Sequence, residues 1–534
     1  MLNQGNADFA TAGAVHRWSE PTSASPAKPS PPADISAAQR PERLRIHYDA
    51  SLIMHFGMET PVGLVRVDQY VAEYLARDPT LDLWFLVFDA TLASYRRLTP
   101  TEHQLLRRIL FHRYERSTIA SPPPKPPSLF TARLLLRRLR TASTLDAPMF
   151  NHMLNYYLDE LLPPAPAPGS ARDRAARAAR QTSLPVARCG HLILYRLTAG
   201  VRRALKIDRP AVSPPASDAV PSAEPIHFDS GSVLVSMGNS WDYLDYAYLH
   251  RICRKGGVRF VSVIYDVIAM EYPHTTPGPP HVYHRHWVEL GHCAAHLLAI
   301  SRFSAGQYRE FIGDPNDLHP SMSHAYLPSV LRDRAGDIGE TAVPQLLGRR
   351  FVVFCSTIET RKNHQLLLQL WDRLRLEFSN DQLPILVFVG RWGWGTEAVR
   401  LLSERNFRLR SRLLILDRTS DAELIWLYRN ARFTVFPSLS EGYGLAAAES
   451  LSFGTPVVTA SCPALLEATE GLMPAYDPLD FVAWLAEMRQ LIRDDARLDE
   501  LKSAAARYRG PPYEAFADAI RATAFAVSEP CHAA

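Results

Sequence analysis

The sequence predicts an α/β protein with two Rossmann-like domains that face each other across a cleft. Apolar, strand-like runs alternate with helix-like segments from about 43 to 335, and the same alternation returns from 346 to 510. This alternation is typical of parallel sheets covered by helices. A chain of 534 residues that is 47% hydrophobic and 21% charged is large enough for two such cores. We expect a ligand to bind between them.

Changes in composition set the expected limits of the domains. Residues 1–40 are rich in Ala, Ser and Pro and carry few large apolar side chains, so we expect a disordered tail there. The first domain is predicted at 41–335 and the second at 346–510. A C-terminal helix and tail at 511–534 follow, beginning at a pair of prolines.

An arginine-rich insertion interrupts the first domain at about 115–225, and we expect it to be basic and helical. Two interpretations stay open: peripheral contact with an anionic membrane, or a solvated helical insertion or disordered loop. Residues 1–40 lack a signal-peptide pattern, and no stretch of about 18 apolar residues predicts a membrane span. We therefore predict a cytoplasmic protein, placed at the inner face of the cytoplasmic membrane if the first interpretation holds.

Charge, cysteines and glycine motifs argue against several classes of protein. The net charge of +4 does not by itself indicate a nucleic-acid partner. The six cysteines form no C-x-x-C pair, so we predict no metal site and no disulfide framework, and a reducing compartment is the simpler interpretation. A dehydrogenase is disfavoured because neither first β–α loop carries G-x-G-x-x-G.

Polar residues and glycines follow the expected strands of the first domain. A strand is predicted at Arg43–Met54, then a loop containing Gly63 and a helix. A buried strand at Val258–Tyr265 ends at Asp266, and in open α/β sheets ligands lie outside the carboxyl ends of the strands. A further strand precedes Ser304, which we expect to cap a helix. Residues 313–349 are expected to connect the two domains.

In the second domain, two adjacent cations stand at the expected start of a helix. Arg361 and Lys362 follow the strand at Val352–Phe354. Cations there oppose the helix dipole, whereas a bound diphosphate would complement them. The next strand, Ile385–Val389, ends at Gly390, which permits close approach of a ligand.

The stretch Ser438–Pro456 combines a strand end, a glycine turn and a helix start. Glu441 lies at the turn and Glu449 within the helix, roughly 12 Å further along the axis at the usual helical rise. That separation suits two ends of an extended ligand. The alternative is that Glu441 is an acid at a helix N-terminus and Glu449 a solvated helix residue.

Three segments resemble glycosyltransferase family 4, whose members are retaining enzymes of the GT-B fold. Its E-x(7)-E signature resembles the run Glu441-Gly442-Tyr443-Gly444-Leu445 together with Glu449. Its Glu-x-Arg-Lys-Asn donor loop resembles Glu359-Thr360-Arg361-Lys362-Asn363. The segment that ends in Tyr265 and Asp266 resembles one that usually ends in His-Asp, so Tyr265 departs from the pattern.

The resemblance implies roles for these residues. Glu441 would contact the transferred sugar and Glu449 the ribose, while Arg361 and Lys362 would neutralise the donor diphosphate. Asp266 completes the expected catalytic set. The remaining donor-binding residues would be Gly63, Gly390, Gly442, Tyr443, Gly444 and Leu445. The implied mechanism needs no metal and no cofactor.

The resulting hypothesis is a retaining hexosyltransferase of the mannosyl or rhamnosyl type. Its donor would be a nucleotide sugar, with a GDP-sugar favoured, and its acceptor a glycan or lipid-linked glycan in bacterial surface polysaccharide synthesis. The alternative is a non-catalytic module that binds a sugar nucleotide in polysaccharide assembly. A GT-B epimerase or phosphorylase is disfavoured, because the Arg-Lys-Asn loop and the Glu-Gly-Tyr-Gly-Leu turn occur together.

Overall fold

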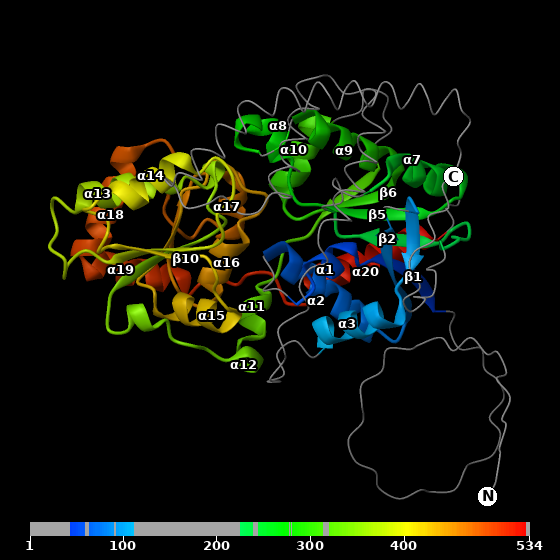
Figure 1. Ribbon diagram of the computed structural model, residues 1–534, viewed down its shortest axis with the longest axis horizontal. Coiled ribbons are helices and arrows are strands. Elements are labelled where there is room, and N and C mark those ends of the chain that lie inside the picture. The colour runs from blue at the N-terminus through cyan, green and yellow to red at the C-terminus, as the bar shows by residue number, and fades with distance from the viewer. Residues whose placement is uncertain are drawn as a thin grey trace, which may run out of the picture. The chain divides into compact units, whose positions relative to one another are not determined.

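Two helix-covered sheets make up the described part of the chain (Figure 1). The computed structural model describes residues 43–58, 63–89, 92–111, 225–238, 244–276, 278, 280–312 and 320–529. The predicted tail at 1–40 and the predicted insertion, apart from residue 225, lie outside these residues. Both sheets belong to one compact unit of the chain.

The first sheet has seven strands in the order β3-β2-β1-β4-β5-β6-β7. Its strands are β1 (Leu44–Asp49), β2 (Leu81–Asp89), β3 (Ser94–Arg97), β4 (Val233–Ser236), β5 (Arg259–Ile264), β6 (Ala294–Ala299) and β7 (Ser321–His324). Its helices include α1 (Ser51–Phe56), α2 (Gly63–Arg77), α3 (Pro100–Phe111), α7 (Tyr246–His250), α8 (Ile268–Glu271), α9 (Pro280–Cys293) and α10 (Arg302–Ile312). Neighbouring strands are parallel, and β3 alone among the described strands pairs antiparallel, with β2.

The second sheet has six parallel strands in the order β10-β9-β8-β11-β12-β13. They are β8 (Phe351–Cys355), β9 (Ile385–Val389), β10 (Leu413–Leu416), β11 (Thr434–Phe436), β12 (Val457–Ala460) and β13 (Ala475–Tyr476). The helices from here on are α11 (Val330–Asp333), α12 (Ala335–Ile338), α13 (His364–Leu374), α14 (Glu397–Arg405), α15 (Asp421–Asn430), α16 (Leu445–Ser452), α17 (Pro463–Ala468), α18 (Phe481–Arg493), α19 (Asp495–Ala505) and α20 (Ala515–Ser528). Counted along the chain, the strand order is the 3-2-1-4-5-6 order of Rossmann folds.

Alternation along β8 explains why helices cover both faces of the second sheet. Val352 and Phe354 are buried in one apolar core, whereas Phe351 and Val353 are buried in the core on the opposite face. Successive side chains of a strand point to opposite faces, so an entirely apolar strand needs a cover on each. The predicted fold class, two Rossmann-like α/β domains, is therefore confirmed.

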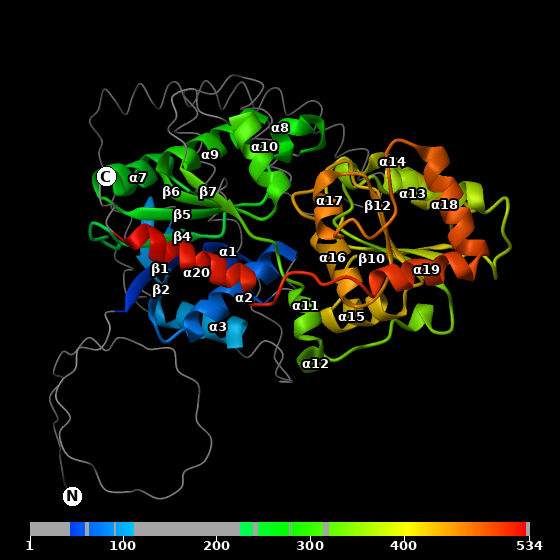
Figure 2. The ribbon, with the colours of Figure 1, turned by 180° about the vertical axis from the view of Figure 1, so that it is seen from behind.

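The last described helix, α20, packs against the first sheet rather than the second (Figure 2). Phe516 and Ile520 lie in the same core as Ile46 and Val233. The Tyr74 hydroxyl also donates a hydrogen bond to the Asp518 carboxylate at 3.0 Å. The sequence predicts a helix here but not its partner.

Three local expectations about the first sheet need correction. The strand predicted at Arg43–Met54 ends at Asp49, and α1 begins two residues later. The proposed connection at 313–349 contains β7, whose Ser-Met-Ser-His sequence lacks the apolar run that would identify a strand. Ser304 is not the cap of α10, because the Ser301 hydroxyl accepts a hydrogen bond from the Ser304 N–H at 2.9 Å.

Candidate functional site

A pocket of about 980 Å³ is lined by loops and helices of both sheets. Its volume lies near the upper end of the usual range for small-molecule sites, so a nucleotide sugar fits its size. The pocket lies at the carboxyl ends of β8 and β11, where the strand order of the second sheet reverses. Its charged lining residues are five basic ones (Arg66, Arg361, Lys362, Arg391, Arg418) and five acidic ones (Asp266, Glu359, Asp417, Glu441, Glu449).

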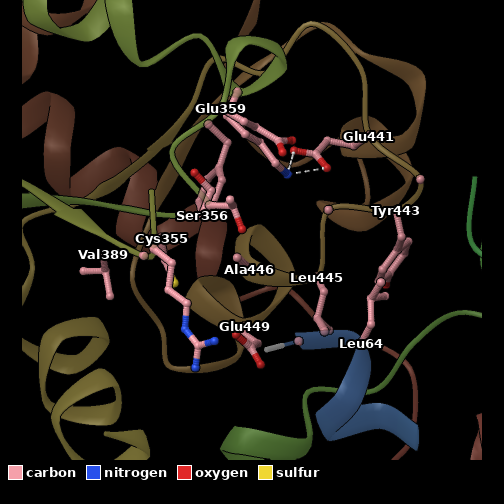
Figure 3. A pocket seen from close by; sticks show the side chains of 18 of the residues that line it. Leu64, Cys355, Ser356, Glu359, Val389, Glu441, Tyr443, Leu445, Ala446 and Glu449 are labelled. Atoms are coloured by element: carbon pink, nitrogen blue, oxygen red, sulfur yellow. Dashed lines mark hydrogen bonds and ion pairs between the residues drawn. The ribbon is translucent and has the colours of Figure 1, made fainter. Parts of the chain in front are cut away.

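One end of the pocket contains a tight cluster of ion pairs around Glu441 (Figure 3). Lys362 Nζ donates to both carboxylate oxygens of Glu441, at 2.6 and 2.8 Å. Arg361 Nη1 donates to Glu441 Oε2 at 3.1 Å, and Arg361 Nη2 donates to Glu359 Oε1 at 2.6 Å. Glu441 is 8% exposed and Glu359 2%. The two cations predicted to bind a diphosphate therefore lie beside the carboxylate predicted to bind the sugar.

Backbone geometry holds the two loops of this cluster together. Arg361 and Lys362 lie in a short 3₁₀ turn, and Asn363 follows with a left-handed φ of 58° before α13 begins. The Asn363 amide donates to the Pro437 carbonyl at 3.3 Å, and the Leu439 N–H donates to the Arg361 carbonyl at 2.9 Å. The loop after β8 is thus fastened to the loop after β11.

The cations control the ionisation of Glu441. Burial would raise the pKa of this carboxyl, but Lys362 and Arg361 outweigh that effect and lower its pKa to about 2. Burial raises the pKa of Asp266, with Arg361 opposing the shift, and it also raises the pKa of Glu359. Glu441 is therefore charged at neutral pH and depends on its two partners to be so.

Gly442 brings the turn after β11 close to the first sheet. A Cβ atom on Gly442 would lie 2.3 Å from the Tyr265 carbonyl oxygen, so no larger residue fits without a shift. The Ser301 and Ser304 hydroxyls both donate to the Gly442 carbonyl, at 2.5 and 2.8 Å. Gly442 therefore joins the turn after β11 to the ends of β5 and β6.

Glu449 lies at a second place in the pocket, on the other side of Leu445 and Ala446 in the view of Figure 3. It is 3% exposed, so the alternative that it is a solvated helix residue is wrong. Its carboxylate accepts from Arg66 Nη1 at 3.5 Å and from the Tyr428 hydroxyl at 3.3 Å. Arg66 also binds Asp421, with Nη2 2.7 Å from Oδ1.

Other predicted site residues line the same pocket, namely Gly63, Gly390, Tyr443, Gly444, Leu445 and Asp266. Gly390 has another reason to be a glycine. Its φ is 153°, and a Cβ atom there would lie 2.0 Å from the Ser356 carbonyl oxygen. The close approach that Gly390 permits is thus between two loops of the protein. The buried Tyr265 hydroxyl has no hydrogen-bond partner among the described residues, so its role stays open.

Sequence reasoning missed three charged residues of the site. Glu359 stands in the recognised Glu-x-Arg-Lys loop, and that motif was the available signal for its contact with Arg361. Arg66 lies one turn after Gly63, in a helix whose buried face is otherwise largely apolar. Asp421 is the first residue of α15, an ordinary position for an acid, and nothing in the sequence relates it to Arg66.

The described ranges offer neither a metal centre nor a membrane-spanning helix. No group of three or more His, Cys, Asp or Glu side chains in those ranges is arranged to hold a metal ion. No helix within them is both long and apolar enough to cross a membrane.

Two Rossmann-like domains with a ligand-sized pocket lined by both are the architecture of the GT-B fold. The family described as "Glycosyl transferases group 1" matches residues 342–506, so the chain carries a group 1 glycosyltransferase domain. That match includes β8 to β13 and the loops bearing Arg361, Lys362 and Glu441.

Curated relatives and solved structures add the following likenesses. O-antigen chain mannosyltransferase B of Escherichia coli is 28% identical over 288 residues, which are 51% of this chain and 73% of that protein. Serotype-specific mannosyltransferase WbdA of Escherichia coli is 26% identical over 209 residues, 39% of this chain and 26% of that protein. An α,α-trehalose 6-phosphate synthase structure from Burkholderia multivorans has a TM-score of 0.43 at 12% identity, covering 56% of this chain and 70% of that one.

Proposed function

We propose that this protein is a retaining hexosyltransferase that uses a nucleotide-sugar donor. Mannose is the favoured sugar and a GDP-sugar the favoured donor, with a glycan or lipid-linked glycan of a bacterial surface polysaccharide as the acceptor. Likeness to two mannosyltransferases, one of them named for the O-antigen chain, supports the sugar and the pathway class. The resemblance to family 4 supports the retaining outcome and a place in the cytoplasm, at the membrane surface if the insertion binds lipid.

The observation that carries the proposal is the cluster of Lys362, Arg361 and Glu441. The charged side chains that line the pocket are balanced, five basic against five acidic. Lys362 and Arg361 are both bound to Glu441, so a diphosphate that binds these two cations has to displace that carboxylate. Lys362 and Arg361 are the cations whose present partner, Glu441, would be released by that exchange.

This exchange assigns each group a task in the transfer. Lys362 and Arg361 move to the diphosphate and stabilise the charge that develops as its bond to the sugar breaks. Glu441, freed from both cations, accepts hydrogen bonds from hydroxyls of the transferred sugar and orients its ring. The acceptor oxygen bonds to the anomeric carbon on the face from which the diphosphate leaves. A donor phosphate oxygen on that face takes the acceptor proton, and the configuration is retained.

A thermal-shift screen against GDP-, UDP-, dTDP- and ADP-sugars tests the donor. A ligand held at about 100 times its dissociation constant stabilises the fold by roughly 2.7 kcal/mol. We expect the GDP-sugars to give the largest shift, and the stabilising donor to release its nucleoside diphosphate when acceptor glycan is added.

Two results would contradict the proposal. Binding without any turnover, by donor hydrolysis or transfer, would favour a non-catalytic module. The absence of a shift with all four donors would remove the donor assignment. The configuration of the product, measured by anomeric proton NMR, tests retention separately.

A further inference from the structure

A buried ion-pair network connects the first sheet to the Glu449 end of the pocket. Arg66 comes from the first turns of α2, which packs on the first sheet, whereas Asp421 and Glu449 come from α15 and α16 of the second. The side chains of Arg66, Asp421 and Glu449 are 8%, 8% and 4% exposed. Three charges at such depth are costly unless they neutralise one another.

Glu449 lines the pocket, and its carboxylate has acceptor capacity left for a ligand. Arg66 takes Oε1 and the Tyr428 hydroxyl takes Oε2. An ionised carboxylate has about four acceptor positions, so each oxygen can accept one more hydrogen bond. Two vicinal hydroxyls are the donors that such a carboxylate binds, and the ribose of a nucleotide presents that pair.

We propose that Arg66 is a positioning residue for the nucleotide half of the donor site: held by Asp421, it fixes the Glu449 carboxylate in the orientation that accepts both ribose hydroxyls. This inference rests on the proposed function. Arg66 lines the pocket, and in this proposal it acts through Glu449. The ribose site is therefore assembled from both sheets, although Glu449 belongs to the second alone.

Several groups surround the Glu449 carboxyl and decide its charge. They are Arg66 from α2, Asp421 and Tyr428 from α15, and Cys355 from β8. Burial raises the pKa of Glu449, Arg66 lowers it, and Asp421 raises it by less than Arg66 lowers it. Removal of Arg66 together with the charge of Asp421 should thus raise the pKa of Glu449 further. A carboxyl with a raised pKa binds hydroxyls as a carboxylate only above that pKa, so binding is lost as the pH falls through it.

The test compares GDP with its 2′,3′-dideoxy analogue by titration calorimetry at pH 6.5 and pH 9, with the matching uridine nucleotides beside them. The wild-type protein should bind GDP about 10- to 100-fold more tightly than the dideoxy analogue at both pH values, as expected for hydrogen bonds from the 2′ and 3′ hydroxyls to a charged group. Arg66→Met combined with Asp421→Asn avoids leaving two buried acids without a cation. This double variant should lose much of the hydroxyl preference, and lose more of it at pH 6.5 than at pH 9, whereas Arg66→Lys should keep it at both.

Arg334→Met is the matched control. Arg334 Nη1 binds the buried Glu73 of helix α2, the helix that carries Arg66, at 2.6 Å, and Arg334 is not among the residues that line the pocket. This variant should keep the wild-type preference for the hydroxyls at both pH values.

The outcomes separate this inference from the proposed function. If the double variant keeps the hydroxyl preference at pH 6.5, or loses affinity for GDP and its dideoxy analogue equally, Arg66 is only structural and the inference falls. If the wild-type protein binds inorganic pyrophosphate but shows no hydroxyl preference, the ribose site is contradicted while the diphosphate site is still supported. If it binds neither nucleotides nor pyrophosphate, the proposed function fails and the inference fails with it.

Discussion

The two ends of the pocket hold their glutamates in different ways. Glu441 is bound by Lys362 and Arg361, which lie 79 and 80 residues earlier and follow a neighbouring strand of the same sheet. Glu449 is bound by Arg66, which lies 383 residues away on a helix of the other sheet. The cations bound to Glu441 come from the second domain alone, whereas the cation bound to Glu449 comes from the first domain. Changes to the first end should therefore alter chemistry and phosphate binding, and changes to the second should alter nucleotide binding.

Glu441→Ala should have the largest effect on transfer. Loss of a preorganised polar group in an active site typically costs about 10²- to 10³-fold in kcat. Nucleotide binding should persist or tighten, because Lys362 and Arg361 lose the carboxylate that competes with the diphosphate. Steady-state kinetics and calorimetry measure the two effects, with Glu404→Ala, an exposed glutamate of α14, as the control. Unchanged turnover would remove the sugar-site assignment.

Arg361→Ala combined with Lys362→Ala should weaken diphosphate ligands by about 100-fold or more, since each lost charged hydrogen bond is worth about 1.5–3 kcal/mol. The affinity for the bare nucleoside should hardly change, because the ribose end is intact. Calorimetry with GDP and guanosine makes the comparison, and Arg373→Ala, on the half-exposed face of α13, is the control. Equal losses for both ligands would contradict the phosphate role.

Gly442→Ala tests whether the turn after β11 needs its contact with the first sheet. The added methyl group would lie 2.3 Å from the Tyr265 carbonyl oxygen, and overpacking of this kind costs about 1–3 kcal/mol. We expect transfer to fall about tenfold or more, with a smaller change in GDP affinity. Gly306→Ala in α10 meets nothing within 4 Å and should be tolerated. A Gly442→Ala enzyme with wild-type kinetics would show that the turn moves away without loss.

The smallest effect concerns pH and stability. Burial lowers the pKa of His364 to about 3, against 6.5 for the exposed group. Below pH 6.5 the unfolded chain binds a proton at His364 that the folded chain does not. The contribution of the neutral, buried His364 to the free energy of unfolding is therefore present above pH 6.5 and is lost as the pH falls toward 3. The loss is about 1.4 kcal/mol per pH unit.

Replacement of this histidine should flatten the pH dependence. In His364→Gln, urea midpoints between pH 7 and pH 5 should vary less steeply than in the wild-type protein. Some pH dependence should remain in the variant, because His286 is still present and burial lowers its pKa to about 3 as well. An unchanged slope would show that His364 takes up its proton without unfolding.

Particular elements show where sequence reasoning succeeds. The apolar strands β8 and β11 are recognisable from composition, and the Rossmann strand order makes them neighbours. Arg361, Lys362 and Glu441 were assigned to one site by the resemblance to the family motifs, and in the structure the loops after these two strands meet. β7 could not be found in this way, because it lacks the apolar run that normally identifies a strand. Only its pairing with β6 shows that it is one. α20 was expected as a helix, but its apolar face would fit either sheet.

The sequence by itself determined the α/β alternation, the glycine turn and the motifs that carry Arg361, Lys362 and Glu441, because strand periodicity and motif spacing are local properties of the chain. Only the tertiary structure decided that Glu449 is buried, that Arg66 and Asp421 surround it, and that Gly442 abuts Tyr265. Those contacts depend on how separate elements pack, and a lone arginine or aspartate carries no mark of its distant partner. The physical reason is burial: removal of these charges from water makes their pairing obligatory, and burial is a property of the folded chain alone.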